Sequence, residues 1–314
     1  MMPLIALFAG GYSSEREISL ESANNVFEAI EKKCEIIFID LQKDQWIDHI
    51  TGEKIQMDCP SGTIISGQQK RRPDYAVIMI HGLPGENGWL QGLLEMCHIP
   101  YSSGGPLNLG VTFDKGMTIA FLEKFGFPTA KSQVIYADRP FSLRIKFPLF
   151  CKPCEAGSSF GISLVEQEED LQKAIQFAEK ESRKILLEEK MVGREISCGV
   201  YRKIEGEIQV LRGTEITTDE PFFNYEAKYL GKSLEITPAP LTEGEYTDLE
   251  SLCMEVYDSL QCKGIVRIDF ILNAEHGFRI IEVNSIPGFT KESIVPQQLR
   301  DLFIPFSDVF ALPI

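Results

Sequence analysis

The sequence is short of positive charge and contains no long apolar run. Its 31 lysines and arginines stand against 46 aspartates and glutamates, which gives a net charge of −15. This acidic balance argues against nucleic acid and anionic membranes as partners, although local lysines can still hold an anionic substrate. No stretch approaches the roughly 18 apolar residues of a membrane-spanning helix, and the apolar N-terminus lacks the basic residues of a signal peptide. We therefore expect a soluble protein.

Several common catalytic and cofactor motifs are also missing. With only four histidines, no Ser–His–Asp set can be recognised. No G-x-x-x-x-G-K-[ST] loop occurs, and the glycines after the first predicted strand match G-x-G-x-x-G poorly. Cys151 and Cys154 are spaced as C-x-x-C, but Pro153 lies between them and no second pair follows, so zinc is not expected. The eight cysteines are scattered, several in apolar runs, which favours a reducing, cytoplasmic compartment.

The beginning of the chain predicts a parallel α/β unit. A strand at residues 3–9 is followed by two glycines, and Ser14 and Glu17 then have the spacing of a helix-capping box. Apolar residues recur at helical spacing from Leu20 to Ile30, and a second strand follows at residues 35–40. A strand, a glycine loop, a helix and a strand in this order are typical of folds that bind ligands at the strand ends.

A chain of 314 residues is too long for one typical core, so several domains are expected. We predict three: residues 1–103, 104–187 and 188–314. Residues 42–73 are predicted to be irregular, residues 75–80 to form a third strand, and residues 114–125 a helix. A short strand at residues 147–152 and an amphipathic helix around residues 171–178 belong to the second unit, and the last unit is rich in strands.

Residues 265–290 are the most informative stretch. They predict a β-hairpin with its turn at residues 273–277, which places Asp269 opposite Glu282 and Arg267 opposite Asn284. Alternation also predicts that four residues of the second strand share a face: Phe278, Ile280, Glu282 and Asn284. Two carboxylates facing each other across a ladder repel, unless a cation lies between them. Carboxylates with an amide oxygen are ligands that Mg²⁺ prefers. The alternative is a hairpin with one solvated face.

Four further segments combine features of a ligand site, and each has an ordinary structural explanation. Lys152 followed by the small residues 157–161 suits a phosphate, or it is a flexible surface loop. His81 and Glu86 lie in a tight glycine-rich loop that either contacts a ligand or forms a βα turn with a capping histidine. Residues 186–195 suit an adenine or form a solvated charged turn. Residues 225–229 are also consistent with an ordinary amphipathic patch.

In combination and in this order, the segments resemble the D-alanine–D-alanine ligases of the ATP-grasp superfamily. The resemblance runs from Gly10 to about Pro296 and rests on these pieces: GGYSSEREISL at 10–20, HGLPGENGWLQG at 81–92, YSSGG at 101–105, DK at 114–115, KPCEAGSSFGI at 152–162, LLEEKMVGREIS at 186–197, YEAKY at 225–229, RIDF at 267–270 and EVNSIPGFTKES at 282–293. Several ligases share the catalytic end of this set. The GGxSxE, HGxxGE and YEAKY pieces are the ones specific to this family.

The resemblance implies a fold, a reaction and its cofactors. The fold is α/β, with a three-domain ATP-grasp architecture in which a parallel α/β domain precedes two α+β subdomains that clamp ATP. ATP phosphorylates the carboxylate of one D-alanine, and the amine of a second D-alanine attacks the acyl phosphate, for peptidoglycan precursor synthesis in the cytoplasm. The cofactors are ATP and two Mg²⁺ (or Mn²⁺). The small-molecule partners are D-alanine and ATP, and the assembly is a homodimer.

The resemblance also implies a role for each matching residue. Glu15 holds the ammonium of the first D-alanine and is linked to Ser158 and Tyr229 when the loop around Lys228 closes. The ATP phosphates contact Lys115, Lys152, Lys228 and the loop that contains Gly157 and Ser159; Glu188 and Met191 face adenine, and Glu195 the ribose. Asp269, Glu282 and Asn284 ligate the metals, while Arg267 and the Gly288 N–H stabilise the oxyanion of the tetrahedral intermediate. His81, Glu86 and Ser293 are assigned to substrate, with Ser293 at the carboxylate of the second D-alanine.

A few positions depart from the family pattern without removing a catalytic charge. Asn87 stands where Asp is frequent, Ser285 where Thr is usual, and Cys151 where an aliphatic residue is common. Tyr229 favours an amino acid as the second substrate, with D-serine still possible. The alternatives are a D-alanine–D-serine or D-alanine–D-lactate ligase, another carboxylate–amine ligase on the same scaffold, or a nucleotide-binding module without turnover.

Overall fold

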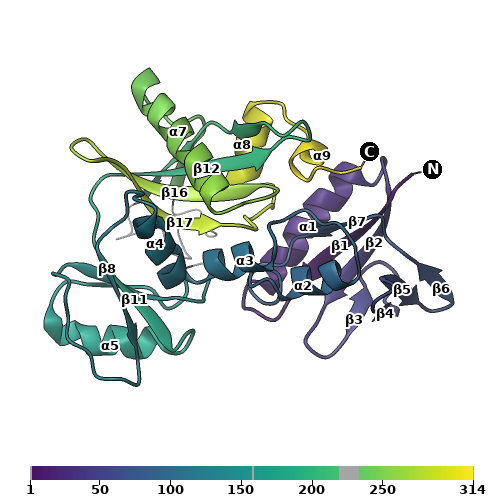
Figure 1. The fold of residues 1–314 in the computed structure, drawn as a ribbon, viewed down its shortest axis with the longest axis horizontal. Coiled ribbons are helices and arrows are strands. Elements are labelled where there is room, and N and C mark those ends of the chain that lie inside the picture. The colour runs from purple at the N-terminus through teal and green to yellow at the C-terminus, as the bar shows by residue number, and fades with distance from the viewer. Residues whose placement is uncertain (1, 158, 219–232, 314) are drawn as a thin grey trace.

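The structure is a computed structural model that describes residues 2–157, 159–218 and 233–313. Within these residues the chain forms three β-sheets, which Figure 1 shows as three groups of strands, each with its own helices. They lie within residues 4–78, 132–189 and 194–284. The domain limits 1–103, 104–187 and 188–314 stay a prediction. Among the described helices, none combines the length and the apolar character that crossing a membrane requires.

The first sheet has the strand order β6-β5-β4-β3-β2-β1-β7. β1 (Leu4–Gly10) pairs in parallel with β2 (Glu35–Leu41) and with β7 (Tyr75–Ile78), and α1 (Arg16–Ile30) connects β1 to β2. The predicted strand–helix–strand unit is confirmed. The predicted capping box is wrong, because the helix begins one residue later than expected. Glu15 occupies the N-cap of α1 without a side-chain cap, and Ser14 lies outside the helix.

The prediction that residues 42–73 are irregular is wrong. They form four short antiparallel strands that extend the first sheet: β3 (Trp46–Asp48), β4 (Lys54–Asp58), β5 (Thr63–Ser66) and β6 (Gln69–Arg71). Each strand has only three to five residues. The few apolar residues that point inward, such as Ile55 and Ile64, are buried but too sparse to give a readable period.

Three helices lead to the second sheet: α2 (Trp89–Met96), α3 (Pro106–Phe113) and α4 (Lys115–Lys124). The predicted helix at residues 114–125 is confirmed, with Asp114 accepting the cap hydrogen bond from the Met117 N–H. The second sheet has the order β10-β9-β11-β8, from β8 (Ser132–Tyr136), β9 (Leu149–Pro153), β10 (Ser163–Val165) and β11 (Lys184–Glu189). The predicted amphipathic helix is α5 (Glu168–Ala178), which buries its apolar residues against β9 and β10.

The third sheet carries the hairpin. Its order is β15-β14-β12-β16-β17 with β13 paired to β12, and its strands are β12 (Arg194–Arg202), β13 (Ile208–Val210), β14 (Thr214–Thr218), β15 (Ser233–Ile236), β16 (Val266–Asn273) and β17 (Gly277–Asn284). In Figure 1 the helix α7 (Glu243–Ser259) covers one face of this sheet, and its buried residues join the core that the sheet forms. A capping box made by Thr242 and Glu245 fixes the start of α7.

The register of the hairpin is confirmed, but its predicted face is wrong. Asp269 pairs with Glu282 and Arg267 with Asn284, while the ladder shifts between Asp269 and Phe270 so that Phe270 faces Ile280. Ile281 is the extra residue of this β-bulge. The bulge reverses the alternation, so Ile280 is buried in the core of the sheet, whereas Glu282 and Asn284 point into a cavity on the opposite face.

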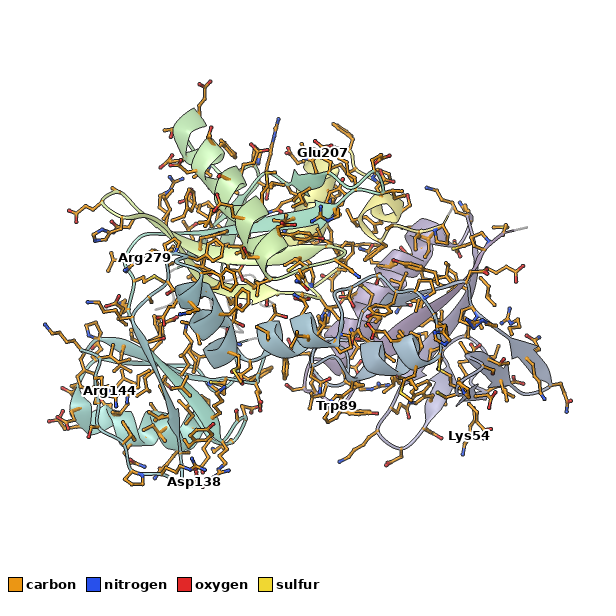
Figure 2. All side chains as sticks on the ribbon, viewed as in Figure 1. Lys54, Trp89, Asp138, Arg144, Glu207 and Arg279 are labelled. Atoms are coloured by element: carbon orange, nitrogen blue, oxygen red, sulfur yellow. The ribbon has the colours of Figure 1, made fainter. Side chains whose placement is uncertain are left out.

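The end of the chain returns to the first sheet. The helices α8 (Ile294–Asp301) and α9 (Phe306–Val309) follow the hairpin, and the two termini lie near each other in Figure 1. Phe289 and Phe310 belong to the same buried core as β1 and β7. The loop that leaves the hairpin is therefore packed against the N-terminal unit, which fixes where the loop lies relative to the strand ends. In Figure 2, side chains such as Trp89, Asp138 and Glu207 project outward from the edges of the molecule.

Candidate active site

A single cavity of about 780 Å³ contains the predicted site residues that the structure describes. They come from strands of the second and third sheets, and from loops and helix ends beside all three sheets. The lining includes Glu15, His81, Glu86, Lys115, Lys152, Gly157, Ser159, Glu188, Met191, Glu195, Arg267, Asp269, Glu282, Asn284, Gly288 and Ser293. Ser158, Lys228 and Tyr229 lie outside the described residues. Segments far apart in the sequence are thus brought to one place, while the role of each residue remains a prediction.

The hairpin supplies a charged patch on one wall. The Arg267 guanidinium donates to both Asp269 oxygens, Nε to Oδ1 at 2.9 Å and Nη2 to Oδ2 at 2.8 Å. Asn284 Nδ2 donates to Asp269 Oδ2 at 3.0 Å, and Lys115 Nζ lies 3.6 Å from Glu282 Oε2. The repulsion between the facing carboxylates is therefore reduced by an arginine and a lysine of the chain itself. Ser197 also donates to Asp269, which leaves that carboxylate heavily hydrogen-bonded.

This patch suits a divalent cation only in combination with a further ligand. Among the described residues, no group of three or more histidines, cysteines, aspartates or glutamates is arranged to hold a metal by itself. Two carboxylates and one amide oxygen are hard donors of the kind that Mg²⁺ takes, and Mg²⁺ commonly completes its shell with phosphates and water. The donor set therefore fits a metal bound together with a nucleotide better than a free-standing metal site.

A second pair of charges lies deeper in the cavity. Lys152, on β9, forms an ion pair with Glu188, on β11, and both side chains are buried. Glu188 Oε1 is buried and has no hydrogen-bond partner among the residues that the structure describes. An unsatisfied buried acceptor costs free energy, so a ligand that donates a hydrogen bond here would be stabilised. Lys115 Nζ donates to the Ala156 carbonyl at 2.6 Å, which ties the small-residue loop to the start of α4.

The loop after β9 approaches the start of α1 closely. A Cβ atom on Gly157 would lie only 2.2 Å from Glu15 Oε2, so only glycine leaves room for this carboxylate. Residues 157–161 also happen to spell G-x-S-x-G. In an esterase-type elbow a helix would follow directly, but in the described part of the chain β10 comes next. The loop therefore offers a backbone cradle rather than a nucleophile.

Glu86 is a carboxyl that burial keeps protonated. It accepts a hydrogen bond from the Gly82 N–H at 2.7 Å. Burial, with the nearby negative charge of Glu15, raises the pKa of Glu86 from 4.5 to about 8, against the opposing effect of Lys115. At neutral pH the Glu86 side chain is thus mainly neutral and has a proton to donate.

His81 holds two parts of the chain together. Its Nδ1 lies 3.1 Å from the Ile286 carbonyl, and its Nε2 lies 3.1 Å from Ser22 Oγ. A carbonyl only accepts, so Nδ1 carries the proton. Burial lowers the pKa of His81, which favours the neutral ring and leaves Nε2 to accept from Ser22. Both ring nitrogens are used by protein groups, so His81 positions the loop after β17.

The far end of the cavity is formed by the turn into α8. Ser293 is the N-cap residue of α8, and its Oγ accepts from the Thr290 N–H at 3.1 Å and lies 2.8 Å from Thr290 Oγ1. A Cβ atom on Gly288 would lie 3.0 Å from Ser293 Oγ. This turn therefore brings a hydroxyl, a helix N-terminus and a glycine N–H to one side of the cavity.

Sequence reasoning missed several residues of the lining. Glu215 and Glu235 come from β14 and β15, and Thr290 from the turn before α8. Glu215 is held by a bidentate pair with Arg194, at 2.9 and 2.7 Å, which lowers the pKa of Glu215 despite its burial. The alternating polar residues Glu215 and Thr217 could have predicted a polar face on this short strand, but they belong to no recognisable motif.

Comparison with known proteins agrees with this arrangement. The family described as "D-ala D-ala ligase N-terminus" matches residues 4–104, and "D-ala D-ala ligase C-terminus" matches residues 120–311. A D-alanine–D-alanine ligase of Phocaeicola vulgatus is 37% identical over 316 residues, covering 98% of this chain and 97% of the relative. The chain belongs to the D-alanine–D-alanine ligase family.

Solved structures of related ligases have the same fold as this ligase. D-alanyl-alanine synthetase A of Vibrio cholerae superposes with a TM-score of 0.86 at 28% identity, covering 98% of this chain and 95% of that one. The VanG D-Ala:D-Ser ligase of Enterococcus faecalis also gives 0.86 at 28% identity, covering 99% and 98%. The predicted α/β ATP-grasp fold is confirmed.

Proposed function

We propose that this ligase joins two D-alanines to D-alanyl-D-alanine at the expense of ATP, through a D-alanyl phosphate. The observation that carries the proposal is the cavity: it gathers every described residue to which the resemblance gives a role. The relatives named D-alanine–D-alanine ligase, matched over nearly their whole length, support the same activity. Phosphoryl transfer needs mainly positioning and charge neutralisation, and the cavity offers groups for both.

The nucleotide would lie between the second and third sheets. The unsatisfied Glu188 Oε1 is an acceptor for the amino group of adenine, with Met191 beside it and Glu195 at the ribose. Lys115 and Lys152 would bind the phosphates. To do so, Lys152 must share its ammonium between Glu188 and the phosphate. Gly157 and Ser159 would close over the phosphates with their backbone.

The metal ligands would be Asp269, Glu282 and Asn284. Two Mg²⁺ or Mn²⁺ bound with the nucleotide would supply positive charge to the phosphates during transfer. Because Arg267 and Lys115 neutralise the same carboxylates in the absence of ligand, these two side chains would be freed to face the substrate.

The first D-alanine would lie at the N-terminal end of the cavity. Glu15 would hold its ammonium, and the neutral Glu86 would add a hydrogen-bond donor nearby. Arg267 and the Gly288 N–H would stabilise the oxyanion that forms when the second amine attacks. Exclusion of water matters because an acyl phosphate hydrolyses. We assign Ser158, Lys228 and Tyr229, which lie outside the described residues, to the closing loop by resemblance alone.

The wider biological setting follows from the same assignment. The dipeptide would feed peptidoglycan precursor synthesis in the cytoplasm, and the chain would act as a homodimer. A D-alanine–D-serine activity is the second candidate, because the VanG D-Ala:D-Ser ligase matches as well in structure as the Vibrio cholerae synthetase does.

The test is ATP-dependent phosphate release by purified protein with Mg²⁺ and D-alanine, L-alanine, D-serine or D-lactate in turn. Release with D-alanine alone, with the dipeptide identified by mass, is the expected result. If phosphate is released only when D-serine or D-lactate is added to D-alanine, the protein is instead a mixed-dipeptide or depsipeptide ligase. The absence of release with all four would refute the proposed substrates.

A further inference from the structure

Glu235 is a cavity carboxylate to which the proposed function gives no role. It lies on β15 directly beside Ile216 of β14, and both residues line the cavity. In the same row of the sheet, Ile216 pairs with Glu195 and Glu195 with Ile271, so alternation turns these four side chains to the same face. Glu235 therefore belongs to the wall of the site and not to the outer surface.

Among the residues that the structure describes, only one of the two Glu235 oxygens accepts a hydrogen bond. Gln297 Nε2 donates to Oε2 at 2.5 Å and also to the Glu292 carbonyl at 2.7 Å, which fixes the carboxylate against the first turns of α8. Within the described residues, Oε1 accepts no hydrogen bond and no lysine or arginine forms an ion pair with Glu235. A partly buried carboxylate without a cation is a favourable place for a cation from outside.

The charges around Glu235 also favour a cation from outside. Burial raises the pKa of Glu235, the negative charge of Glu292 adds to this, and Arg267 and Gln297 oppose it. The Arg267 guanidinium already donates three hydrogen bonds to Asp269. A small cation that enters this end of the cavity would thus meet an incompletely neutralised carboxylate.

The position of Ser293 identifies the kind of cation. Gln297 follows Ser293 by one helical turn, with its N–H 3.2 Å from the Ser293 carbonyl. Its side-chain amide contacts both Glu235 and the carbonyl of Glu292, the residue before Ser293, so Glu235 lies beside the N-terminal turn of α8. The helix N-terminus and the Ser293 hydroxyl favour a carboxylate, and Glu235 favours an ammonium. Both residues line the cavity, so one end of it offers a group for each end of an α-amino acid.

We propose that Glu235 receives the ammonium of the second amino acid and so selects amino acids over hydroxy acids at this position. The inference rests on the proposed function, because it needs a second substrate with its carboxylate at Ser293. Hydroxy acids such as D-lactate lack the ammonium and would gain nothing from Glu235.

The experiment compares the full chain with Glu235→Gln, Glu235→Asp and, as a matched control, Glu31→Gln. Glu31 is an exposed carboxylate at the end of α1 that does not line the cavity. Initial rates are measured against D-alanine to separate the KM values of the two sites. Products formed from D-alanine with D-lactate are then counted by mass.

Glu235→Gln is expected to raise the KM of the second site at least about tenfold, with smaller changes for ATP and the first site. It should also increase the share of ester among the products. Glu235→Asp should recover part of the selectivity, and Glu31→Gln should change both readouts less than about twofold. An unchanged second-site KM and ester share would overturn the inference, as would equal losses with both acceptors. A wild-type chain that forms no dipeptide would instead overturn the proposed function.

Discussion

At the residue scale, charge compensation explains how the site stays folded before any ligand arrives. Asp269 and Glu282 face each other on the hairpin. Arg267 and Asn284 donate hydrogen bonds to Asp269, and Lys115 forms an ion pair with Glu282. Removal of one carboxylate therefore does not leave an isolated buried charge, which is the usual cause of severe destabilisation. Function and stability can be separated by mutation at this site.

The substitution Glu282→Gln tests that separation. It keeps the shape of the side chain, while it removes a negative charge and an oxygen ligand from the proposed metal site. We expect metal-dependent turnover to fall at least about 100-fold, which corresponds to a loss of roughly 3 kcal/mol in transition-state stabilisation. The free energy of unfolding in urea should change by less than about 1 kcal/mol. Normal turnover in this variant would exclude Glu282 as a metal ligand.

Glu86 makes a prediction about pH. Its pKa is near 4.5 when exposed and about 8 in the fold, so between these values the folded state holds a proton that the unfolded chain has released. The stability that protonated Glu86 contributes is fully present below about pH 4.5 and is lost as the pH rises through about 8, by at most roughly 1.4 kcal/mol per pH unit. Glu86→Gln, which stays neutral, should therefore gain melting temperature relative to the wild type between pH 5 and pH 8.

The control for this experiment is Glu31→Gln, which removes an exposed carboxylate at the end of α1. Its difference from the wild type should stay flat across the same pH range. If the Glu86→Gln difference is equally flat, Glu86 is ionised in the fold and the donor role proposed for it fails.

The site residues could be located from the sequence because short motifs report on them directly. Segments such as 81–88 and 282–293 contain side chains whose types fit phosphates, metals and carboxylates, and the cavity includes those that the structure describes. Pairings across the chain could not be located in this way. The contact of His81 with Ile286 and that of Glu235 with Gln297 join residues 205 and 62 positions apart, and no local pattern encodes them.

At the scale of elements, the β-bulge in the hairpin shows why alternation of residue types along a strand does not always predict which face a side chain occupies. The pairing of Asp269 with Glu282 follows from the turn position, so the sequence predicts it. The extra residue at Ile281 changes which face each later side chain occupies, and an isoleucine there fits either face. The short strands of residues 46–71 show a similar limit, because three to five residues are too few to establish a period.

The loop after β9 gives a prediction at the same scale. Gly157 has no positive φ, so alanine suits its backbone, but the added Cβ would lie 2.2 Å from Glu15 Oε2. Gly157→Ala should displace the Glu15 carboxylate or hold the loop away from it. We expect kcat/KM for the first D-alanine to fall at least about tenfold, and the affinity for ATP to weaken as well, because the same loop is proposed to close over the phosphates.

Gly244→Ala is the matched control for Gly157→Ala. Gly244 lies in the first turn of α7, and a Cβ atom there would meet no other atom within 4 Å. This variant should keep full activity. Full activity in Gly157→Ala as well would show that the loop does not need to approach Glu15.

At the scale of the whole molecule, the end of the chain braces the site. Asn25 of α1 donates to the Phe289 carbonyl at 2.7 Å, and Ser22 accepts from the Phe289 N–H at 3.1 Å. The Phe289 ring packs against Phe306 and Phe310 with centroids 5.0 Å apart in each case. The turn that contains Gly288 and Ser293 is therefore held by α1 and by the last helix together.

Phe310→Ala tests this bracing. Phe310 is fully buried, so its truncation should cost about 3–5 kcal/mol in the free energy of unfolding and should also lower activity, because the turn after β17 loosens. Phe303 is 94% exposed, and Phe303→Ala should change stability by less than about 0.5 kcal/mol. Urea unfolding and turnover are measured on both variants. Equal effects of the two substitutions would contradict a bracing role for the C-terminal segment.

The most direct test of the central claim follows an oxygen atom. If the cavity activates D-alanine as an acyl phosphate, one carboxylate oxygen must leave with the phosphate when the second amine attacks. D-alanine labelled with ¹⁸O in its carboxylate is incubated with the protein, ATP and Mg²⁺, and the phosphate and dipeptide are analysed by mass. We predict one labelled oxygen in each phosphate released with dipeptide. Unlabelled phosphate accompanying dipeptide would contradict the acyl phosphate route, and phosphate without dipeptide would contradict the ligase activity itself.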